Sequence, residues 1–138
     1  EIKTERYEFW TLKAQHMKNE NALFYLIKQG DKAFLQCNDT GCLFEEVYDY
    51  LSKLGVKIDL VALDCTMGKQ TKSYFGHMNL AECLETVERM RGSNFVKPNT
   101  RFILTHLCHN GLLLHDDYEK LCAPHGVEVA YDGLEIEI

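Results

Sequence analysis

The sequence lacks the features that would place the protein in a membrane, in a secretory pathway or on a nucleic acid. No apolar run approaches the roughly 20 residues of a membrane-spanning helix, and the charged N-terminal residues are unlike a signal peptide. The net charge of −6 argues against general binding to nucleic-acid backbones or anionic membranes. With 138 residues and 46% hydrophobic content, we expect one soluble globular domain spanning 1–138.

The six cysteines also lack the paired CxxC spacing of a structural zinc site. Several of them fall inside apolar runs, where a free cysteine behaves as a small hydrophobic side chain. An even count permits disulfides, but a chain with this much core does not depend on them. We therefore expect free thiols and a reducing, cytoplasmic setting.

The hydrophobic pattern predicts an α/β fold with a mixed sheet. Period-two and fully apolar stretches alternate, from residue 43 onward, with stretches at helical spacing. The predicted strands are 7–14, 23–27, 32–37, 58–63 and 101–105, and the predicted helices are 43–54, 79–90 and 113–122. Asn79 and Glu82 predict a capping box, and Asp132-Gly133 predicts a closing hairpin within Val127–Ile138.

The segment from Arg101 to Gly111 is the most informative stretch of the chain. An apolar run of strand length ends there in His106, and His109 follows three residues later. A buried strand is rigid and its tip is open to solvent, so such a tip is a common place for a site in an α/β protein. Neutral imidazole is also the commonest ligand of transition metals. His106 is therefore the first candidate for a functional residue.

Other polar residues stand where predicted strands end. His16, Asp39 and Asp64 follow three of the strands, and His77 lies in a loop just before a helix. Because the carboxyl ends of strands collect the ligand site in doubly wound sheets, these side chains are expected to converge. Each also has a simpler interpretation: Asp39 as a turn residue, His77 as a solvated loop histidine, and the His106–His109 pair as chance. Residue types and spacing leave both interpretations open.

These motifs follow one another along nearly the whole chain in a characteristic order: His16, Asp39-Thr40-Gly41, Leu63-Asp64-Cys65, Gly76-His77-Met78, Leu104-Thr105-His106-Leu107-Cys108-His109 and Val129-Ala130-Tyr131-Asp132-Gly133-Leu134-Glu135-Ile136. The succession resembles the C-terminal half of a metallo-β-lactamase-fold hydrolase. It is similar in particular to the cyclic-phosphate phosphodiesterase of phosphonate breakdown and, more distantly, to tRNA 3′-end-processing endonucleases. The resemblance implies half of a four-layer αββα sandwich, with helices on one face of a mixed sheet.

The resemblance implies a role for each matched residue. His16, Asp39 and His106 match metal ligands, and Asp39 matches the carboxylate that bridges two divalent ions, zinc or manganese. His77 matches a loop histidine that acts as general acid on the leaving oxygen or holds the phosphate. Two further residues, Asp64 and His109, match positions that orient the ligands.

The family's H-x-H-x-D-H cluster is absent, and it belongs to an N-terminal half that this sequence does not contain. We therefore expect the chain alone to bind metal weakly and to turn over little. The apolar side of its sheet should also be exposed, and it should pair with the missing half or with a second copy. The residues expected on that side are Phe24, Leu26, Phe34, Val61 and Ile103.

Three functional hypotheses follow. The first is a metal-dependent phosphodiesterase that acts on a small phosphodiester, of which this chain is the C-terminal part. The second is a catalytically inactive half-domain that serves as a binding or assembly module. The third is a mononuclear metal-binding protein that uses His16, Asp39 and His106.

Overall fold

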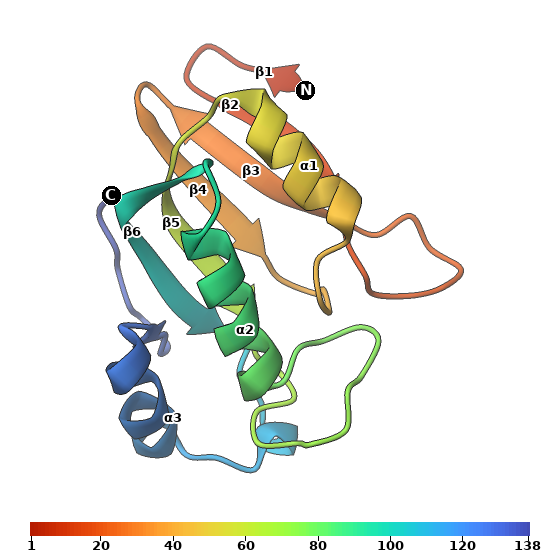
Figure 1. The fold of residues 1–138 in the computed structure, drawn as a ribbon, viewed down its shortest axis with the longest axis vertical. Helices are drawn as coiled ribbons and strands as arrows, with labels where there is room; N and C mark the ends of the chain where they lie inside the picture. Colours follow the sequence, from red (N-terminus) through yellow and green to blue (C-terminus); the bar gives the residue numbers. More distant parts are fainter.

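A single mixed sheet organises the computed structural model, which describes residues Glu1 to Ile138 (Figure 1). Its seven strands follow the order of the chain: β1 Ile2–Lys3, β2 Glu8–Lys13, β3 Leu23–Gln29, β4 Lys32–Cys37, β5 Ile58–Asp64, β6 Val96–Thr105 and β7 Glu128–Val129. Strands β1 to β4 pair antiparallel, and β4 to β7 pair parallel. The predicted α/β fold with a mixed sheet is confirmed.

Three helices cover one face of this sheet: α1 Glu45–Leu54, α2 Leu80–Arg91 and α3 His115–Cys122. Figure 1 shows α1 and α2 in front of the central strands. The main core of 28 buried residues lies between the helices and the sheet, where Leu26 and Phe102 pack with Leu51 and Val87. None of the three helices combines the length and the apolar character needed to cross a membrane.

Local signals set the ends of two helices as the sequence predicted. Asn79 accepts a hydrogen bond from the backbone N–H of Glu82, and the Glu82 carboxylate accepts one from the N–H of Asn79, each at 2.9 Å. This capping box satisfies two N–H groups that α2 leaves unpaired. Gly55 ends α1 in the left-handed conformation, with φ of 76°. The capping box also fixes the end of the loop 66–79, which carries His77.

The opposite face of the sheet is only partly covered. Leu60, Ala62 and Ile103 form a small buried cluster there, against which the C-terminal residues Leu134 and Ile136 pack. The rest of this face, here called the open sheet face, extends over β2, β3 and β4. Its apolar residues, all partly or largely exposed, are Phe9, Leu23, Tyr25, Ile27 and Phe34.

Three of the five residues predicted for the exposed face are buried on the helix side instead. Phe24 is 2% exposed, and Leu26 and Val61 are fully buried in the main core. Only Phe34 and Ile103 lie on the opposite face. The prediction was wrong because successive strand residues alternate between faces, and the register, which places Leu26 beside Leu35 and Ile27 beside Phe34, decides which set faces the helices.

The closing hairpin was also predicted wrongly. Strand β7 pairs parallel with β6, with Leu104 beside Val129, and no strand follows it. The turn itself forms, with Gly133 at φ of 87° and Leu134 N–H donating to Tyr131. The residues after the turn pack Leu134 and Ile136 against the sheet instead of pairing with β7, which removes apolar surface from water.

Candidate metal centre

The candidate centre lies where the parallel strands end. Strands β4, β5 and β6 run in the same direction, so the segments that follow them meet at one edge of the sheet. Asp39 follows β4, Asp64 is the last residue of β5, and His106 follows β6. The loop 66–79 brings His77 to the same place. Ligand atoms of these four side chains all lie within 4.8 Å of one another.

Two imidazoles face one carboxylate oxygen. Asp39 Oδ1 lies 3.4 Å from His106 Nε2 and 3.9 Å from His16 Nε2. Ligands that share one ion at bond lengths of roughly 2.1 Å in tetrahedral geometry are separated by roughly 3.4 Å. The two distances from Asp39 are therefore close to the spacing of ligands on one ion, but His16 is not in the group of four side chains whose ligand atoms all lie within 4.8 Å of one another.

The buried carboxylate of Asp64 orients His77 and His106, here called the two inner histidines. Its Oδ2 accepts a hydrogen bond from His77 Nδ1 at 2.8 Å, and its Oδ1 accepts one from the Thr66 hydroxyl at 2.8 Å. Thr66 Oγ1 in turn lies 2.7 Å from His106 Nδ1 and 2.9 Å from the His106 backbone carbonyl, and Asp64 Oδ2 lies 3.4 Å from the same Nδ1. The acceptor oxygens of Asp64 favour the tautomer in which the ring proton of both histidines is on Nδ1. The Nε2 atom of each is left as a free base that can bind a metal or take up a proton.

Backbone strain is concentrated at two of these residues. Asp39 has φ of 51° and His106 has φ of 57°, and Leu112 is the only other non-glycine residue with positive φ. Left-handed backbone costs a non-glycine residue roughly 1 kcal/mol or more, and such strain is found preferentially at functional sites. The structure therefore keeps an aspartate and a histidine at positions where glycine or asparagine would be less strained.

His77 lies within a stack of rings. Tyr74 stacks on it with centroids 5.8 Å apart, and His106 stacks on its other side at 5.5 Å. The ring of His16 approaches it edge-on at 5.2 Å. His77 therefore lies beside His16 and His106, which both approach Asp39. Unlike His16, it is hydrogen-bonded to Asp64. Its Nε2 is therefore placed either to carry a proton or to bind a metal.

One predicted orienting residue lies outside the centre. His109 is exposed in a short 3₁₀ turn, His109–Gly111, and its side chain forms no hydrogen bond or ion pair. The residue that orients His106 is Thr66 and not His109. The chain changes direction at His106, which has positive φ, so that His109 lies outside the centre. The sequence analysis missed Thr66. Its one available signal was its position two residues after Asp64, at the end of a buried strand.

The nearby thiols are poor competitors for a metal. Cys83 donates a hydrogen bond to the Asp64 backbone carbonyl at 3.2 Å, behind the carboxylate network. Burial raises the pKa of the Cys83 thiol, and the neighbouring Cys65 raises it further. Burial likewise raises the pKa of Cys37. Because only the thiolate is a strong metal ligand, these protonated sulfurs leave the imidazole and carboxylate groups as the donor set.

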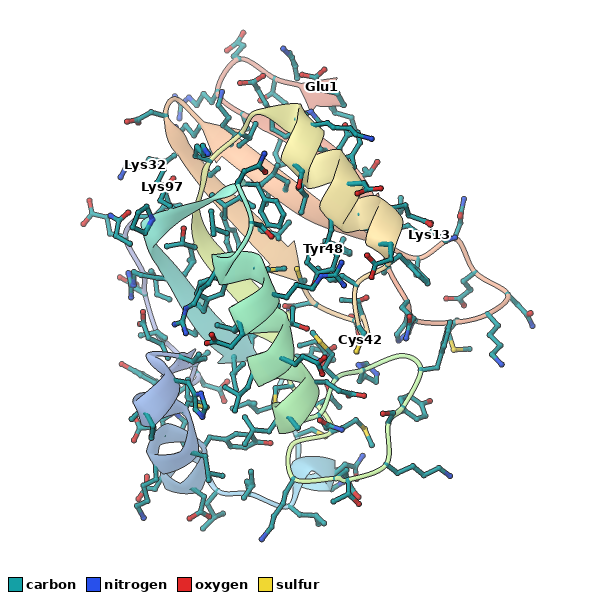
Figure 2. All side chains as sticks on the ribbon, in the orientation of Figure 1. Glu1, Lys13, Lys32, Cys42, Tyr48 and Lys97 are labelled. Atoms are coloured by element: carbon teal, nitrogen blue, oxygen red, sulfur yellow. The ribbon has the colours of Figure 1, made fainter.

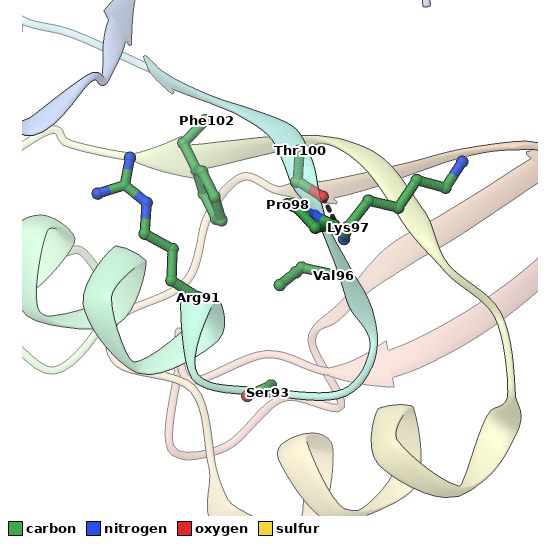
Figure 3. A pocket seen from close by; sticks show the side chains of 7 residues that line it. All are labelled: Arg91, Ser93, Val96, Lys97, Pro98, Thr100 and Phe102. Carbon is green, nitrogen blue, oxygen red and sulfur yellow. Dashed lines mark hydrogen bonds between the residues drawn. The ribbon is translucent and has the colours of Figure 1, made fainter.

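A polar pocket at the amino end of β6 is separate from this centre (Figure 3). Two of its lining residues, Arg91 and Lys97, are cations, but both have partners. Arg91 donates to the carbonyl of His125 and pairs with Glu88, and Lys97 pairs with Asp59 at 2.6 Å. Lys32 approaches Asp59 as well, and Figure 2 shows Lys32 and Lys97 side by side. Both cations of the pocket are therefore paired with carboxylates of the protein itself.

The Thr66 network gives a direct test of how the centre is built. Thr66→Val keeps the shape of the side chain but leaves Asp64 Oδ1 and His106 Nδ1 each short of one partner. We expect the free energy of unfolding to fall by about 1–3 kcal/mol. We also expect zinc affinity to fall by roughly 10- to 100-fold, because the His106 ring is no longer held. Denaturant unfolding and calorimetric titration with Zn²⁺ measure the two effects. Thr71→Val, in the same loop, is the matched control.

Comparison with known proteins identifies the fold. No family model matches the sequence, and no curated protein matches it. Among solved structures, the metallo-β-lactamase-fold protein YhfI from Bacillus subtilis matches 99% of this chain and 52% of its own, with a TM-score of 0.72 and 20% identity. A diphosphatase from the PhnP family matches 99% of this chain and 46% of its own, with a TM-score of 0.64 and 20% identity.

A third similar structure is Zn²⁺-bound PqqB from Methylobacterium extorquens, with a TM-score of 0.64 and 17% identity over 96% of this chain and 50% of its own. The chain has the metallo-β-lactamase fold, as the resemblance in the sequence implied. It spans about half the length of the solved structures that it matches. That share agrees with the prediction that it corresponds to one half of the sandwich.

Proposed function

We propose that this chain is part of a metal-dependent hydrolase that cleaves small phosphodiesters. The observation that carries the proposal is the convergence of His16 Nε2 and His106 Nε2 on the Asp39 carboxylate. The centre lies at the carboxyl edge of the parallel strands, where ligands bind in sheets of this kind. One solved structure with the same fold is a diphosphatase of the PhnP family, which directs the proposal toward phosphoryl chemistry.

His16, Asp39 and His106 are the proposed metal ligands. Imidazole and carboxylate donors suit zinc and manganese, and a carboxylate, unlike an imidazole, can bridge two ions. When bound, such ions polarise a phosphoryl oxygen and acidify a water molecule toward neutrality. Three donors are too few to surround two ions. We therefore propose that the remaining ligands come from a segment or chain packed beside this centre.

The proposed catalytic acid is His77. Its Nδ1 is held by Asp64, so a proton on Nε2 can be donated to the leaving oxygen while the buried carboxylate stabilises the imidazolium form. Asp64 and Thr66 act as positioning residues, because they reach the reacting groups only through the two histidines. A net charge of −6 favours a small phosphodiester over a nucleic acid as the substrate.

The test is substrate-selective hydrolysis by the longest natural polypeptide that contains this sequence. Bis(p-nitrophenyl) phosphate, p-nitrophenyl phosphate and p-nitrophenyl acetate release the same chromophore, so their rates compare the diester, the monoester and the carboxylic ester directly. We expect diester hydrolysis that EDTA abolishes and that Zn²⁺ or Mn²⁺ restores. Equal or faster acetate hydrolysis, or diester hydrolysis that EDTA leaves unchanged, refutes the proposal.

The open sheet face is proposed as the surface that receives the partner. Tyr25 is 41% exposed and Leu23 is 45% exposed, so this face leaves large apolar side chains in water. In the sandwich implied by the fold, a second sheet packs on this side. We propose that the missing half, or a second copy of the chain, covers it. Such a surface is also the specific feature that favours the second hypothesis, an inactive assembly module.

Association through this face can be measured on the chain itself. Size-exclusion chromatography with light scattering should give a mass above 16.0 kDa at micromolar concentration. Phe34→Lys places a charge in the centre of the face and should shift the protein toward monomer. Lys120→Glu, on the exposed side of α3, is the control for a change of charge elsewhere. A clean monomer before substitution contradicts the partner proposal and leaves the metal-site proposal standing.

A further inference from the structure

One residue connects three of the loops that form the metal centre. Gln15 follows β2 and immediately precedes His16. Its backbone N–H donates to Thr40 Oγ1 at 2.9 Å, and its backbone carbonyl accepts from the N–H of Gly41 at 2.8 Å. Its side-chain Nε2 donates to the backbone carbonyl of Phe75 at 3.0 Å. Gln15 therefore contacts both the segment that carries Asp39 and the loop that carries His77.

The contact between these two segments is close. A Cβ atom added to Gly41 would lie 2.3 Å from the Phe75 carbonyl oxygen, which is shorter than any real Cβ contact. The loop can therefore sit against this strand exit only because residue 41 has no side chain. The bond from Gln15 lies beside this approach, since its Nε2 would be 3.0 Å from the same Cβ.

The tip of the loop is itself a small rigid unit. Tyr74 and His77 are paired by an isolated antiparallel bridge, and their rings stack. Phe75 lies inside this turn, so a hydrogen bond to its carbonyl restrains His77 two residues later. The other end of the loop is held separately, where Leu80 N–H donates to Gly68 and Gln70 donates to Asn110. No other side chain donates to the backbone of residues 72–76.

We propose that the Gln15 side chain is a positioning residue that latches the tip of the His77 loop onto the Asp39 segment. The inference extends the proposed function, because the latch holds the proposed acid, His77, beside the proposed ligands. The backbone hydrogen bonds of Gln15 hold the Asp39 segment and do not depend on which side chain residue 15 carries. Substitution of the side chain therefore releases the loop tip and leaves His16, Asp39 and His106 in place. In the active protein, kcat should fall while KM and metal content change little.

The test uses the chain without metal and does not depend on hydrolysis. Trypsin cleaves after Lys69 and Lys72, which are exposed in the loop, and Arg6 in the exposed N-terminal turn serves as an internal reference. In Gln15→Ala we expect cleavage at Lys72 relative to Arg6 to rise about two- to tenfold, the range expected for loss of one hydrogen bond. Gln15→Glu keeps the size but removes the donor, and it should behave in the same way. Gln36→Ala, on the open sheet face, is the control.

Gly41→Ala provides a second route to the same state, because its Cβ must displace the Phe75 carbonyl. We expect the same increase in cleavage at Lys72. The double variant Gln15→Ala, Gly41→Ala should show no more than the larger of the two single effects, because both changes break the same contact. Zinc affinity should be unchanged in Gln15→Ala. The latch is refuted if cleavage at Lys72 is unchanged in Gln15→Ala, or if the effects of the two single variants add fully in the double variant. It is also refuted if the thermal midpoint falls and cleavage accelerates equally at every site, because that result indicates general destabilisation. If the unmodified protein does not hydrolyse diesters, only the proposed function is refuted and the latch is not.

Discussion

Asp39→Asn is expected to weaken zinc binding by more than about 100-fold, since removal of a group that merely supports a ligand already costs roughly 10- to 100-fold. The carboxylate is the only anion that faces both His16 and His106. Asparagine has the same shape and tolerates the left-handed backbone that residue 39 adopts. The free energy of unfolding should therefore stay the same or rise. Calorimetric titration with Zn²⁺ and denaturant unfolding of the same samples separate the two effects.

Asp31→Asn provides the control for loss of one negative charge. Asp31 lies in the exposed turn between β3 and β4, away from the centre. The Asp31→Asn substitution should leave zinc affinity unchanged. If Asp39→Asn binds zinc as tightly as the unmodified chain, the three side chains do not form the metal site, and the proposed hydrolase loses its main support.

His77→Ala is expected to lower the turnover of a phosphodiester by about 10²- to 10⁴-fold, the contribution typical of a positioned general acid. Metal content should not change if His77 is the acid, because the proposed ligands are His16, Asp39 and His106. The effect should be largest for substrates with a poor leaving group, such as an alkyl alcohol. A p-nitrophenyl leaving group needs less protonation, so its hydrolysis should be affected less. Rates for the two diesters, together with elemental analysis of bound metal, test the assignment.

His109→Ala is the matched histidine control. His109 is close in sequence to His106, and its exposed ring contacts none of the residues of the centre. Its removal should leave both turnover and metal content unchanged. A loss of metal in His77→Ala would show that His77 is a ligand rather than an acid. An equal loss of turnover in the two variants would show that the effect is not specific to His77.

Features that depend on neighbours in the chain were predicted correctly. The capping box of Asn79 and Glu82 and the end of α1 at Gly55 each involve residues within one helical turn. The turn at Gly133 also forms as its sequence predicts. The hairpin around that turn does not form, because the partner of β7 was decided by the distant strand β6 and by burial of Leu134 against Ile103. A local turn signal cannot show which of two surfaces its flanks will contact.

The open sheet face shows the same limit. Phe24 and Phe34 are chemically identical and stand in neighbouring strands, yet one is buried under the helices and the other faces the opposite side. A strand pattern states which residues share a face but not which face the helices cover. Thr66 was missed for a related reason. Its hydroxyl matters only because the parallel pairing of β5 and β6 brings it within 2.7 Å of His106.

The sequence by itself determined five of the seven strands, although β6 begins at Val96 rather than at the predicted residue 101, and it missed β1. It also determined two helix ends and the kinds of side chain at the strand exits, because these depend on short-range periodicity and on hydrogen bonds between near neighbours. Only the tertiary structure decided that residues 16, 39, 64, 77 and 106 meet, that Asp64 and Thr66 orient the two inner histidines, and that His109 lies apart. The physical reason is that a metal site requires donors within a few ångströms of one another. Pairing between strands far apart in the chain produces that proximity, and local sequence does not encode it.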